Sequence, residues 1–426
     1  MKSRIHFFWI LLAAILPLCR AEPVKNIIFL IGDGMGFQQV KAARLYNGAP
    51  LVFELFPYDA QQTTYPEPAG SVTDSAAAAT ALATGVKVNN GVISLKIPGD
   101  SSRLETLLEY VKKRGWRTGL VTTKTMTDAT PAAFGAHADS RYDSAVIASE
   151  YLNSSRPNVL LGGGGSGMSV VAAETAGYTV VTDRAELLAL DLSSTEFLSG
   201  QFGSGNFPYE ADGIGDRPHL SEMTAAALDL LDDDPDGFFL MAEGALIDTA
   251  CHANHLSRMM GEMMEFNQAV AVVTNWAAGR TDTLVLVTAD HETGGLSVLA
   301  DNGAGTLPTV SWSTTGHTSS NVPVFVSGNL GGYAEGVMDN TQHFARLTEA
   351  MLVSASNLVL QAGNLPVSVG GSVVSGAVYR LESRDSLVTG QWNPVAVSTA
   401  DAPVVILSDT NSPRADGRFY RLRSLP

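Results

Sequence analysis

Short apolar runs recur along the chain, and each ends at glycine or at a polar residue. They are rich in Val, Ile, Leu and Phe and are shorter than typical helices, which predicts buried strands. The runs are Ile27–Ile31, Gly119–Thr122, Val159–Leu161, Phe238–Met241, Thr283–Val287 and Val322–Val326.

Helix-like segments lie between these runs, at Ser102–Arg114, Ser221–Leu231 and Ser257–Trp276. Buried strands that alternate with helices predict an α/β fold, a three-layer sandwich whose central sheet is largely parallel and covered on both faces. Glycine-rich Gly162–Gly165 and the segment Ser193–Gly215 are interpreted as surface connections, not as a phosphate-binding loop.

Acidic residues follow several of the predicted strands. Asp33, Glu243 and Asp290 each lie two or three residues past an apolar run, and Asp128 and Thr130 follow another. Ligands bind beyond the carboxyl ends of strands in such sheets, so these side chains predict a polar site at one sheet edge. Helix capping is the alternative for any one of them.

The segment Thr73–Gly85 predicts an alanine-rich helix with a capping residue before it and a glycine stop. Ser75 falls at its start, where free N–H groups favour an anion, so a phosphoryl group on this serine is one hypothesis. A simple helix cap at Asp74 or Ser75 is the other.

Histidine and aspartate also recur at spacings that suit metal ligands. Asp248 and His252 are four residues apart, on one face of a predicted helix, and Asp290 directly precedes His291. His317 stands just before the last predicted strand. An exposed ion pair uses the same helical spacing, and a single histidine is more often structural than a ligand.

Composition and charge narrow the function. The chain has 426 residues and a net charge of -16, which becomes -19 without Lys2, Arg4 and Arg20. Such acidity argues against nucleic acid as a partner and favours a small substrate.

Those three cations flank an apolar segment, Phe7–Leu16, that predicts a secretory signal peptide at residues 1–21. The apolar run is shorter than the ~20 residues of a bilayer span. We therefore expect no stable membrane insertion after cleavage, and Cys251 would be the one remaining cysteine, without a disulfide partner.

Several of these segments, taken in order, resemble the alkaline phosphatase family over about residues 25 to 353. The motifs that carry the resemblance are Asn26–Gly36, Thr73–Lys87, Asp128–Ala132, Arg141, Glu243–His252, Thr288–His291 and Gly316–Thr318. The family assignment implies a phosphomonoesterase that is phosphorylated on Ser75 and binds two phosphate oxygens through Arg141.

The resemblance also implies two Zn²⁺ and one Mg²⁺ per chain. It implies one zinc at Asp248, His252 and His317, a second at Asp33, Asp290 and His291, and magnesium at Asp33, Thr130 and Glu243. It further implies a homodimer and a secreted or periplasmic location. Thr249 and Cys251 depart from common family patterns, and Cys251 is interpreted as a buried, inert thiol.

Three alternatives are weighed against this function. A sulfatase is disfavoured, because Ala76, Ala77 and Ala78 follow Ser75 in place of the Pro and Arg needed to form formylglycine. A phosphodiesterase is a closer competitor. The third alternative is a binding protein that kept the fold and lost catalytic activity. The complete set of expected site residues argues against it.

The pattern changes near Ala355–Asn364, and alternating segments with turn-forming pairs follow. This predicts a catalytic domain at residues 22–355 and a small all-β module at residues 356–426. The module is similar, weakly, to domains appended to secreted bacterial proteins, which implies attachment or sorting.

Overall fold

The computed structural model describes residues 24–328, 333, 335–352 and five strands after residue 366. The chain divides into two compact units, of which Pro23–Val353 is one. The predicted signal peptide at 1–21 and the change of pattern at 355–364 lie outside the described residues.

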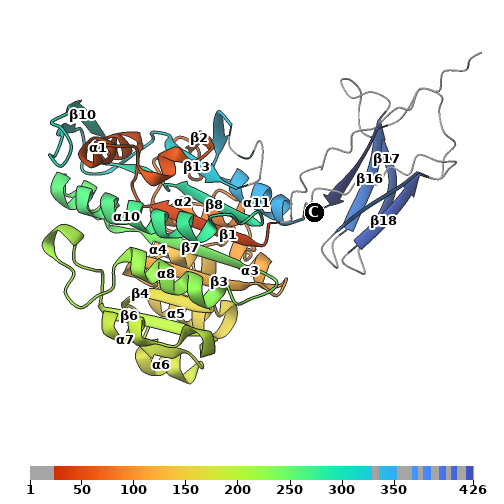
Figure 1. Ribbon diagram of the computed structural model, residues 1–426, viewed down its shortest axis with the longest axis horizontal. Helices are drawn as coiled ribbons and strands as arrows, with labels where there is room; N and C mark the ends of the chain where they lie inside the picture. Colours follow the sequence, from red (N-terminus) through yellow and green to blue (C-terminus); the bar gives the residue numbers. More distant parts are fainter. Residues whose placement is uncertain are drawn as a thin grey trace, which may run out of the picture. The chain divides into compact units, whose positions relative to one another are not determined.

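A ten-stranded sheet forms the centre of the larger unit (Figure 1). From edge to edge its strands are β14 (Val337–Asp339), β2 (Tyr58–Thr63), β13 (Val322–Ser327), β8 (Thr283–Thr288), β1 (Asn26–Gly32), β7 (Phe238–Gly244), β3 (Arg117–Thr125), β4 (Val159–Gly164), β6 (Leu198–Ser204) and β5 (Thr179–Val181). All neighbours in this sheet pair in parallel except β13, which is antiparallel to both β2 and β8. The six predicted apolar runs lie within β1, β3, β4, β7, β8 and β13.

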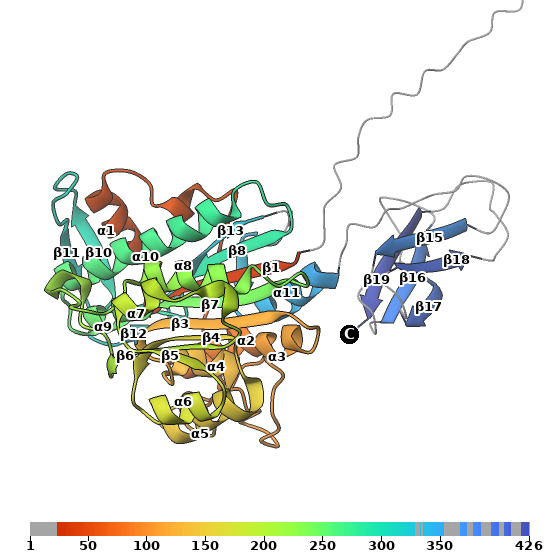
Figure 2. The same ribbon diagram turned by 60° about the horizontal axis from the view of Figure 1, so that its bottom comes forward.

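Helices cover both faces of the sheet. Figure 2 shows α1 (Phe37–Asn47), α8 (Leu220–Leu231) and α10 (Leu256–Ala277) on one side and α2 (Ser75–Thr84), α3 (Leu107–Lys112), α4 (Ala129–Gly135) and α5 (Ser144–Glu150) on the other. Successive side chains of a strand point to opposite faces, so β1 contributes Ile28 and Leu30 to one core and Ile27, Phe29 and Ile31 to the other. The predicted three-layer α/β fold is confirmed.

The predicted helices at Ser221–Leu231 and Ser257–Trp276 are found as α8 and α10, but the prediction at Ser102–Arg114 is wrong in its extent. Helix α3 begins at Leu107, because Thr106 accepts a hydrogen bond from the N–H of Glu109 and donates its own N–H to the Glu109 carboxylate. Before it, Arg103 bridges to Leu95, which holds that stretch extended.

The interpretation of Gly162–Gly165 as a surface connection is wrong for its first three residues, whereas that of Ser193–Gly215 is wrong only for the strand within it. Gly162, Gly163 and Gly164 end the buried strand β4, and β6 occupies Leu198–Ser204 of the second segment, whose remaining residues form turns and loops. A Cβ on Gly163 would come within 1.9 Å of the Gly205 carbonyl oxygen, so glycine permits the two backbones to approach.

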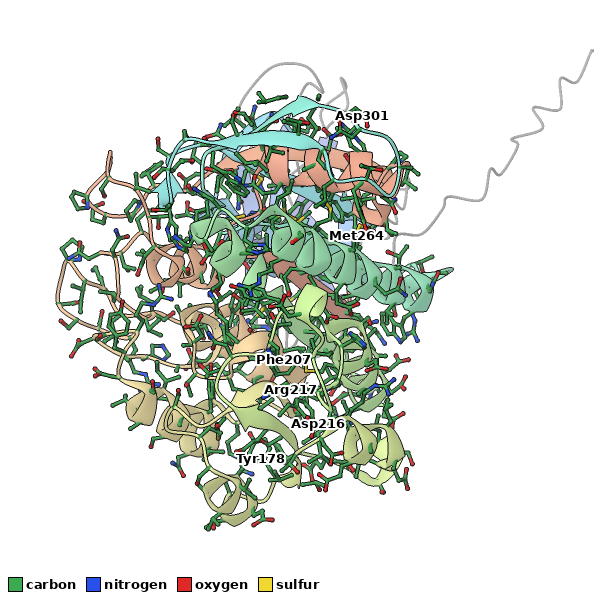
Figure 3. The ribbon with its side chains drawn as sticks, turned by 90° about the vertical axis from the view of Figure 1, so that its left-hand side faces the viewer. Tyr178, Phe207, Asp216, Arg217, Met264 and Asp301 are labelled. Carbon is green, nitrogen blue, oxygen red and sulfur yellow. The ribbon has the colours of Figure 1, made fainter. Side chains whose placement is uncertain are left out.

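The loop after β6 is fixed by an arginine and an aromatic ring. The guanidinium of Arg217 lies 6.0 Å from the ring centre of Phe207, and both side chains lie beside each other in Figure 3. Arg217 also donates to the Phe202 carbonyl, 3.2 Å away. The N–H of Phe207 donates to the carbonyl of Thr123, which ties this loop to the end of β3.

Shorter elements complete the larger unit. They are α6 (Val170–Thr175), α7 (Arg184–Ala189), α9 (Leu246–His252), α11 (Gln342–Leu352), β9 (Glu292–Thr293), β10 (Leu296–Ala300), β11 (Thr309–Trp312), β12 (His317–Thr318), a π turn at Tyr151–Ser155 and 3₁₀ turns at Val52–Leu55, Leu192–Ser194 and Glu210–Asp212. Over the described residues, no helix combines the length and apolarity that crossing a membrane requires.

The other unit contains the strands after residue 366. Strand β15 (Val367–Ser372) pairs with β18 (Val404–Asp409), and β16 (Val378–Arg384) lies between β17 (Asn393–Thr399) and β19 (Phe419–Leu425). All of these pairings are antiparallel. A small C-terminal β structure was predicted and is present.

Candidate metal and phosphoryl-transfer site

Three buried carboxylates meet at the carboxyl ends of three neighbouring strands. Asp33 follows β1, Glu243 lies near the end of β7, and Asp290 follows β8. Each is 0% exposed. The sheet therefore brings together acids that are up to 257 positions apart in the sequence. His291 lies beside Asp33 and Asp290, and Lys124 is paired with Asp33.

Asp248, His252 and His317 form the first cluster of ligand atoms. The Nε2 atoms of the two histidines are 3.0 Å apart, and the Asp248 Oδ1 atom lies 3.3 Å from His252 Nε2 and 3.5 Å from His317 Nε2. Ligands of a tetrahedral zinc ion, each ~2.0–2.1 Å from the metal, lie about 3.3 Å from one another. The three atoms are thus spaced as zinc ligands.

Backbone carbonyls orient both imidazoles of this cluster. His252 Nδ1 lies 2.5 Å from the Thr315 carbonyl oxygen, and His317 Nδ1 lies 2.8 Å from that of Thr73. A carbonyl can only accept, so each Nδ1 carries the proton and each Nε2 is free to bind a metal. Asp248 is fixed by Thr293, whose hydroxyl donates to Oδ1 over 2.6 Å.

Asp33, Asp290 and His291 form the second cluster. His291 Nε2 lies 3.2 Å from Asp290 Oδ2 and 3.6 Å from Asp33 Oδ1, and both oxygens are buried without a hydrogen-bond partner. Burial raises the pKa of Asp290 well above its usual range and lowers that of His291. Orphaned buried oxygens beside a neutral imidazole fit a bound cation.

Close backbone approach joins the two clusters. Gly34 has a φ of 74°, and a Cβ there would lie 2.9 Å from the Cα of Asp248. Its N–H donates to Asp290 Oδ1 over 3.1 Å. Glycine therefore lets the turn after β1 approach Asp248 of α9 closely while it bonds to Asp290.

The third predicted set contains oxygen atoms alone. Thr130 Oγ1, in the first turn of α4, and Glu243 Oε1 are both buried and lack a hydrogen-bond partner. Glu243 Oε2 accepts from the Thr122 hydroxyl over 2.6 Å. Burial is the main cause that raises the pKa of Glu243 to about 8 and that of Asp33 to about 6. Unpaired hard oxygen donors fit a magnesium-type ion.

Ser75 is the first residue of α2 and is 2% exposed. Of the two predicted candidates for the helix cap, Asp74 is the one found: its carboxylate accepts the N–H of Ala77 over 2.9 Å, and Gly85 ends the helix with a φ of 74°. Because Asp74 is the cap, the Ser75 hydroxyl is free to face the second cluster, where Oγ lies 3.3 Å from His291 Nε2.

Arg141 lines the same pocket as Asp248, His252 and His317. Its Nη1 is 3.2 Å from Asp74 Oδ2 and its Nη2 is 3.6 Å from Asp128 Oδ1. The two acids hold the guanidinium fork in place. The pocket is lined by Asp74, Ser75, Thr125, Thr127, Asp128, Arg141, Tyr142, Ser144, Ser166, Asp248, His252 and His317.

Lys124 was not predicted to belong to the site, yet its Nζ lies 2.9 Å from Asp33 Oδ2, in the middle of the acidic cluster. The signal was present, because a lysine at the end of a strand that is otherwise buried requires a partner. Cys251, by contrast, is buried beside Gln39 and burial raises its pKa well above the usual range, as its interpretation as an inert thiol requires.

Comparison with known proteins identifies the family. Residues 24–309 match the family model for alkaline phosphatase, which is more than half of the chain. The chain belongs to the alkaline phosphatase family. It is 41% identical to alkaline phosphatase 3 of Bacillus subtilis over 298 residues, which cover 66% of this chain and 63% of that protein. The match thus spans less than two thirds of that relative's length.

Solved structures of alkaline phosphatases share the fold. The cold-active enzyme of a psychrophilic Shewanella aligns with a TM-score of 0.70 at 31% identity, over 76% of this chain and 99% of the other. A variant of the enzyme from the Antarctic bacterium TAB5, with Mg bound in its M3 site, aligns at 28% identity and the same TM-score, over 78% and 99% of the two chains. Membership of the family agrees with the resemblance read from the sequence motifs.

Proposed function

We propose that this chain is a metal-dependent phosphatase that hydrolyses phosphate monoesters through a phosphoserine at Ser75. One observation carries the proposal: the Ser75 hydroxyl lies between a cluster of metal ligands at His291 and a pocket that contains Arg141. A nucleophile, an anion-binding fork and cation sites are the groups that phosphoryl transfer requires.

The ligand sets favour two zinc ions and one magnesium. Asp248, His252 and His317 would hold the first zinc and Asp33, Asp290 and His291 the second, because each set includes imidazole. Asp33, Thr130 and Glu243 would hold magnesium through oxygen. Positive charge at these sites is the chemistry that the ions would supply, since it stabilises negative oxygen on the serine and on the departing alcohol.

The residues of the chain would perform two displacements at phosphorus. In the first, the Ser75 oxygen gives its proton to solvent and bonds to phosphorus as the bond to the alcohol oxygen breaks, and the departing oxygen takes a proton from solvent. In the second, a water oxygen bonds to phosphorus with loss of a proton as the bond to Ser75 breaks, which releases inorganic phosphate and leaves Ser75 to regain its proton. Arg141 would bind two non-bridging oxygens throughout, and the amino end of α2 would favour the anion.

Trapping of the intermediate tests this proposal. Protein incubated with a labelled phosphate monoester and quenched in acid should carry label on Ser75, located by peptide mapping. Ser75→Ala should lose the label and lower kcat by several orders of magnitude. Ser71→Ala, at an exposed serine outside the pocket, is the matched control and should keep both. Label on a residue other than Ser75 would refute the assignment.

We also propose the domain and export features that the sequence suggests. These are cleavage after residue 21, a catalytic domain at 22–355, a module at 356–426 for surface attachment or sorting, a homodimer, and a secreted or periplasmic location. Amino-terminal sequencing of protein exported from a bacterial host checks the cleavage site, because cleavage after residue 21 leaves Glu22 at the amino terminus. Sedimentation of the same sample measures the oligomeric state.

A further inference from the structure

Lys124 is a cation that the fold itself places among the proposed metal ligands. It lies near the carboxyl end of β3 and is 8% exposed. Its Nζ is 2.9 Å from Asp33 Oδ2, 3.7 Å from Asp248 Oδ2 and 3.8 Å from Asp128 Oδ2. One ammonium group therefore faces three carboxylates.

The backbone around Lys124 is held on both sides. Its N–H donates to the Thr122 hydroxyl over 3.1 Å, and the N–H of Thr125 donates to Asn206 Oδ1 over 3.1 Å. The same Thr122 hydroxyl donates to Glu243. The Lys124 side chain that contacts the acids therefore starts from a hydrogen-bonded strand end and not from a surface loop.

Asp33 is the residue for which this ammonium and the third metal ion compete. Oδ1 of Asp33 faces His291 of the second cluster, and Oδ2 is paired with Lys124. The third set needs an oxygen of Asp33 in addition to Thr130 Oγ1 and Glu243 Oε1, which are buried without a hydrogen-bond partner. A divalent ion bound through Oδ2 would meet an ammonium on the same oxygen, and like charges at such range repel strongly in a buried site.

We propose that Lys124 is a built-in cation that competes with the divalent ion of the third site for Asp33. The chain would therefore keep the two histidine-containing sites filled and bind magnesium weakly, with the ammonium supplying part of the positive charge. The inference rests on the proposed metal sites, but its test does not depend on turnover.

Magnesium affinity of the zinc-loaded full chain tests the proposal. Lys124→Met keeps most of the side-chain length and removes the charge, and isothermal titration with MgCl₂ alone should then give a Kd at least tenfold lower than in the wild type. After desalting, mass spectrometry of bound metals should find magnesium retained by Lys124→Met and lost from the wild type. Lys113→Met, at an exposed lysine paired with Glu105, is the matched control and should match the wild type.

Two further variants show whether the gain in magnesium affinity arises at the third site and replace Lys124→Met if that variant does not fold. Adding Thr130→Val to Lys124→Met should abolish the gain, because it removes a ligand of the third site. Lys124→Gln replaces Lys124→Met if the latter is insoluble, with the same expected gain. Equal or weaker magnesium binding in the charge-removed variant would overturn the proposal. A zinc content below two per chain would count against the proposed function, and it is measured separately from the magnesium ratio.

Discussion

Arg141 owes its orientation to two acids, one at each side of its guanidinium group. Asp74 and Asp128 contact different terminal nitrogens of this guanidinium fork, and all three residues line the pocket. Such a fork suits two terminal phosphate oxygens, and a diester has one of these blocked by its second alcohol. Selectivity between phosphate esters should therefore depend on this one side chain.

We predict a kcat/KM for a nitrophenyl phosphate monoester well above those for the matched diester and sulfate ester. Arg141→Ala should narrow the gap, because it lowers monoester turnover more than diester turnover. Steady-state kinetics on the three substrates measures this, with Arg156→Ala, outside the pocket, as the control. A diester value equal to or above the monoester value contradicts the prediction.

The first metal cluster makes a separate prediction at the same scale. Asp248→Ala and His317→Ala should each lose about one zinc per chain, because each removes one of three ligands whose spacing fits zinc. Loss of metal that binds the folded state should also lower Tm. Metal analysis and thermal unfolding check both effects. His255→Ala, at a histidine that belongs to none of the described groups of possible metal ligands, is the control and should leave the zinc content unchanged. Unchanged zinc in both ligand variants would mean that the site lies elsewhere.

Among the elements, helix α2 was predictable because its signals are local. Asp74, the alanines and Gly85 specify the start, interior and end without help from the rest of the chain. The failures at α3 and β4 have the opposite cause. Arg103 is held extended by its bridge to Leu95, and Gly163 is required by the carbonyl of Gly205, contacts that neither segment reveals by itself.

Helix α10 carries a buried carboxyl whose effect on stability depends on pH. Glu262 is 4% exposed and accepts the N–H of Glu210 over 2.9 Å, and burial raises its pKa to about 8 from an ordinary 4.5. The folded state thus binds its proton more tightly than the unfolded state. The contribution of Glu262 to stability is therefore lost as pH rises from about 4.5 to about 8. The loss is at most roughly 1.4 kcal/mol for each pH unit in that range.

Glu262→Gln should therefore stabilise the protein more at pH 8.5 than at pH 5, by up to a few kcal/mol. Glutamine keeps the acceptor for Glu210 and cannot ionise. Urea unfolding at the two pH values measures the difference between variant and wild type, in which contributions from the metal sites cancel. Glu105→Gln, on a more exposed side chain, serves as the control. A gain that is the same at both pH values would show that ionisation of Glu262 is not the cause.

The whole molecule consists of a unit that holds every proposed site residue and a second, β-rich unit. The larger unit ends with α11, whose Leu347, Ala350 and Met351 belong to the core on the α2 face. A chain that ends at Leu352 should therefore fold and keep at least half of the full-length kcat/KM. Expression, thermal unfolding and turnover of that chain test this, and a chain ending at Asn340, which lacks α11, should be insoluble or inactive. Inactivity of the longer truncation would mean that the β-rich unit completes the site.

The sequence alone indicated the proposed chemistry of this protein, because the candidate ligands, Ser75 and the acids that follow strands are all visible in local order. Tertiary structure decided how they meet. His317 precedes a strand, so in an all-parallel sheet it would lie at the opposite edge from Asp33. It joins the site because β13 runs antiparallel and begins where its neighbours end. Lys124 likewise finds its partner only in the fold, because Asp33 follows a different strand, 91 positions away in the sequence.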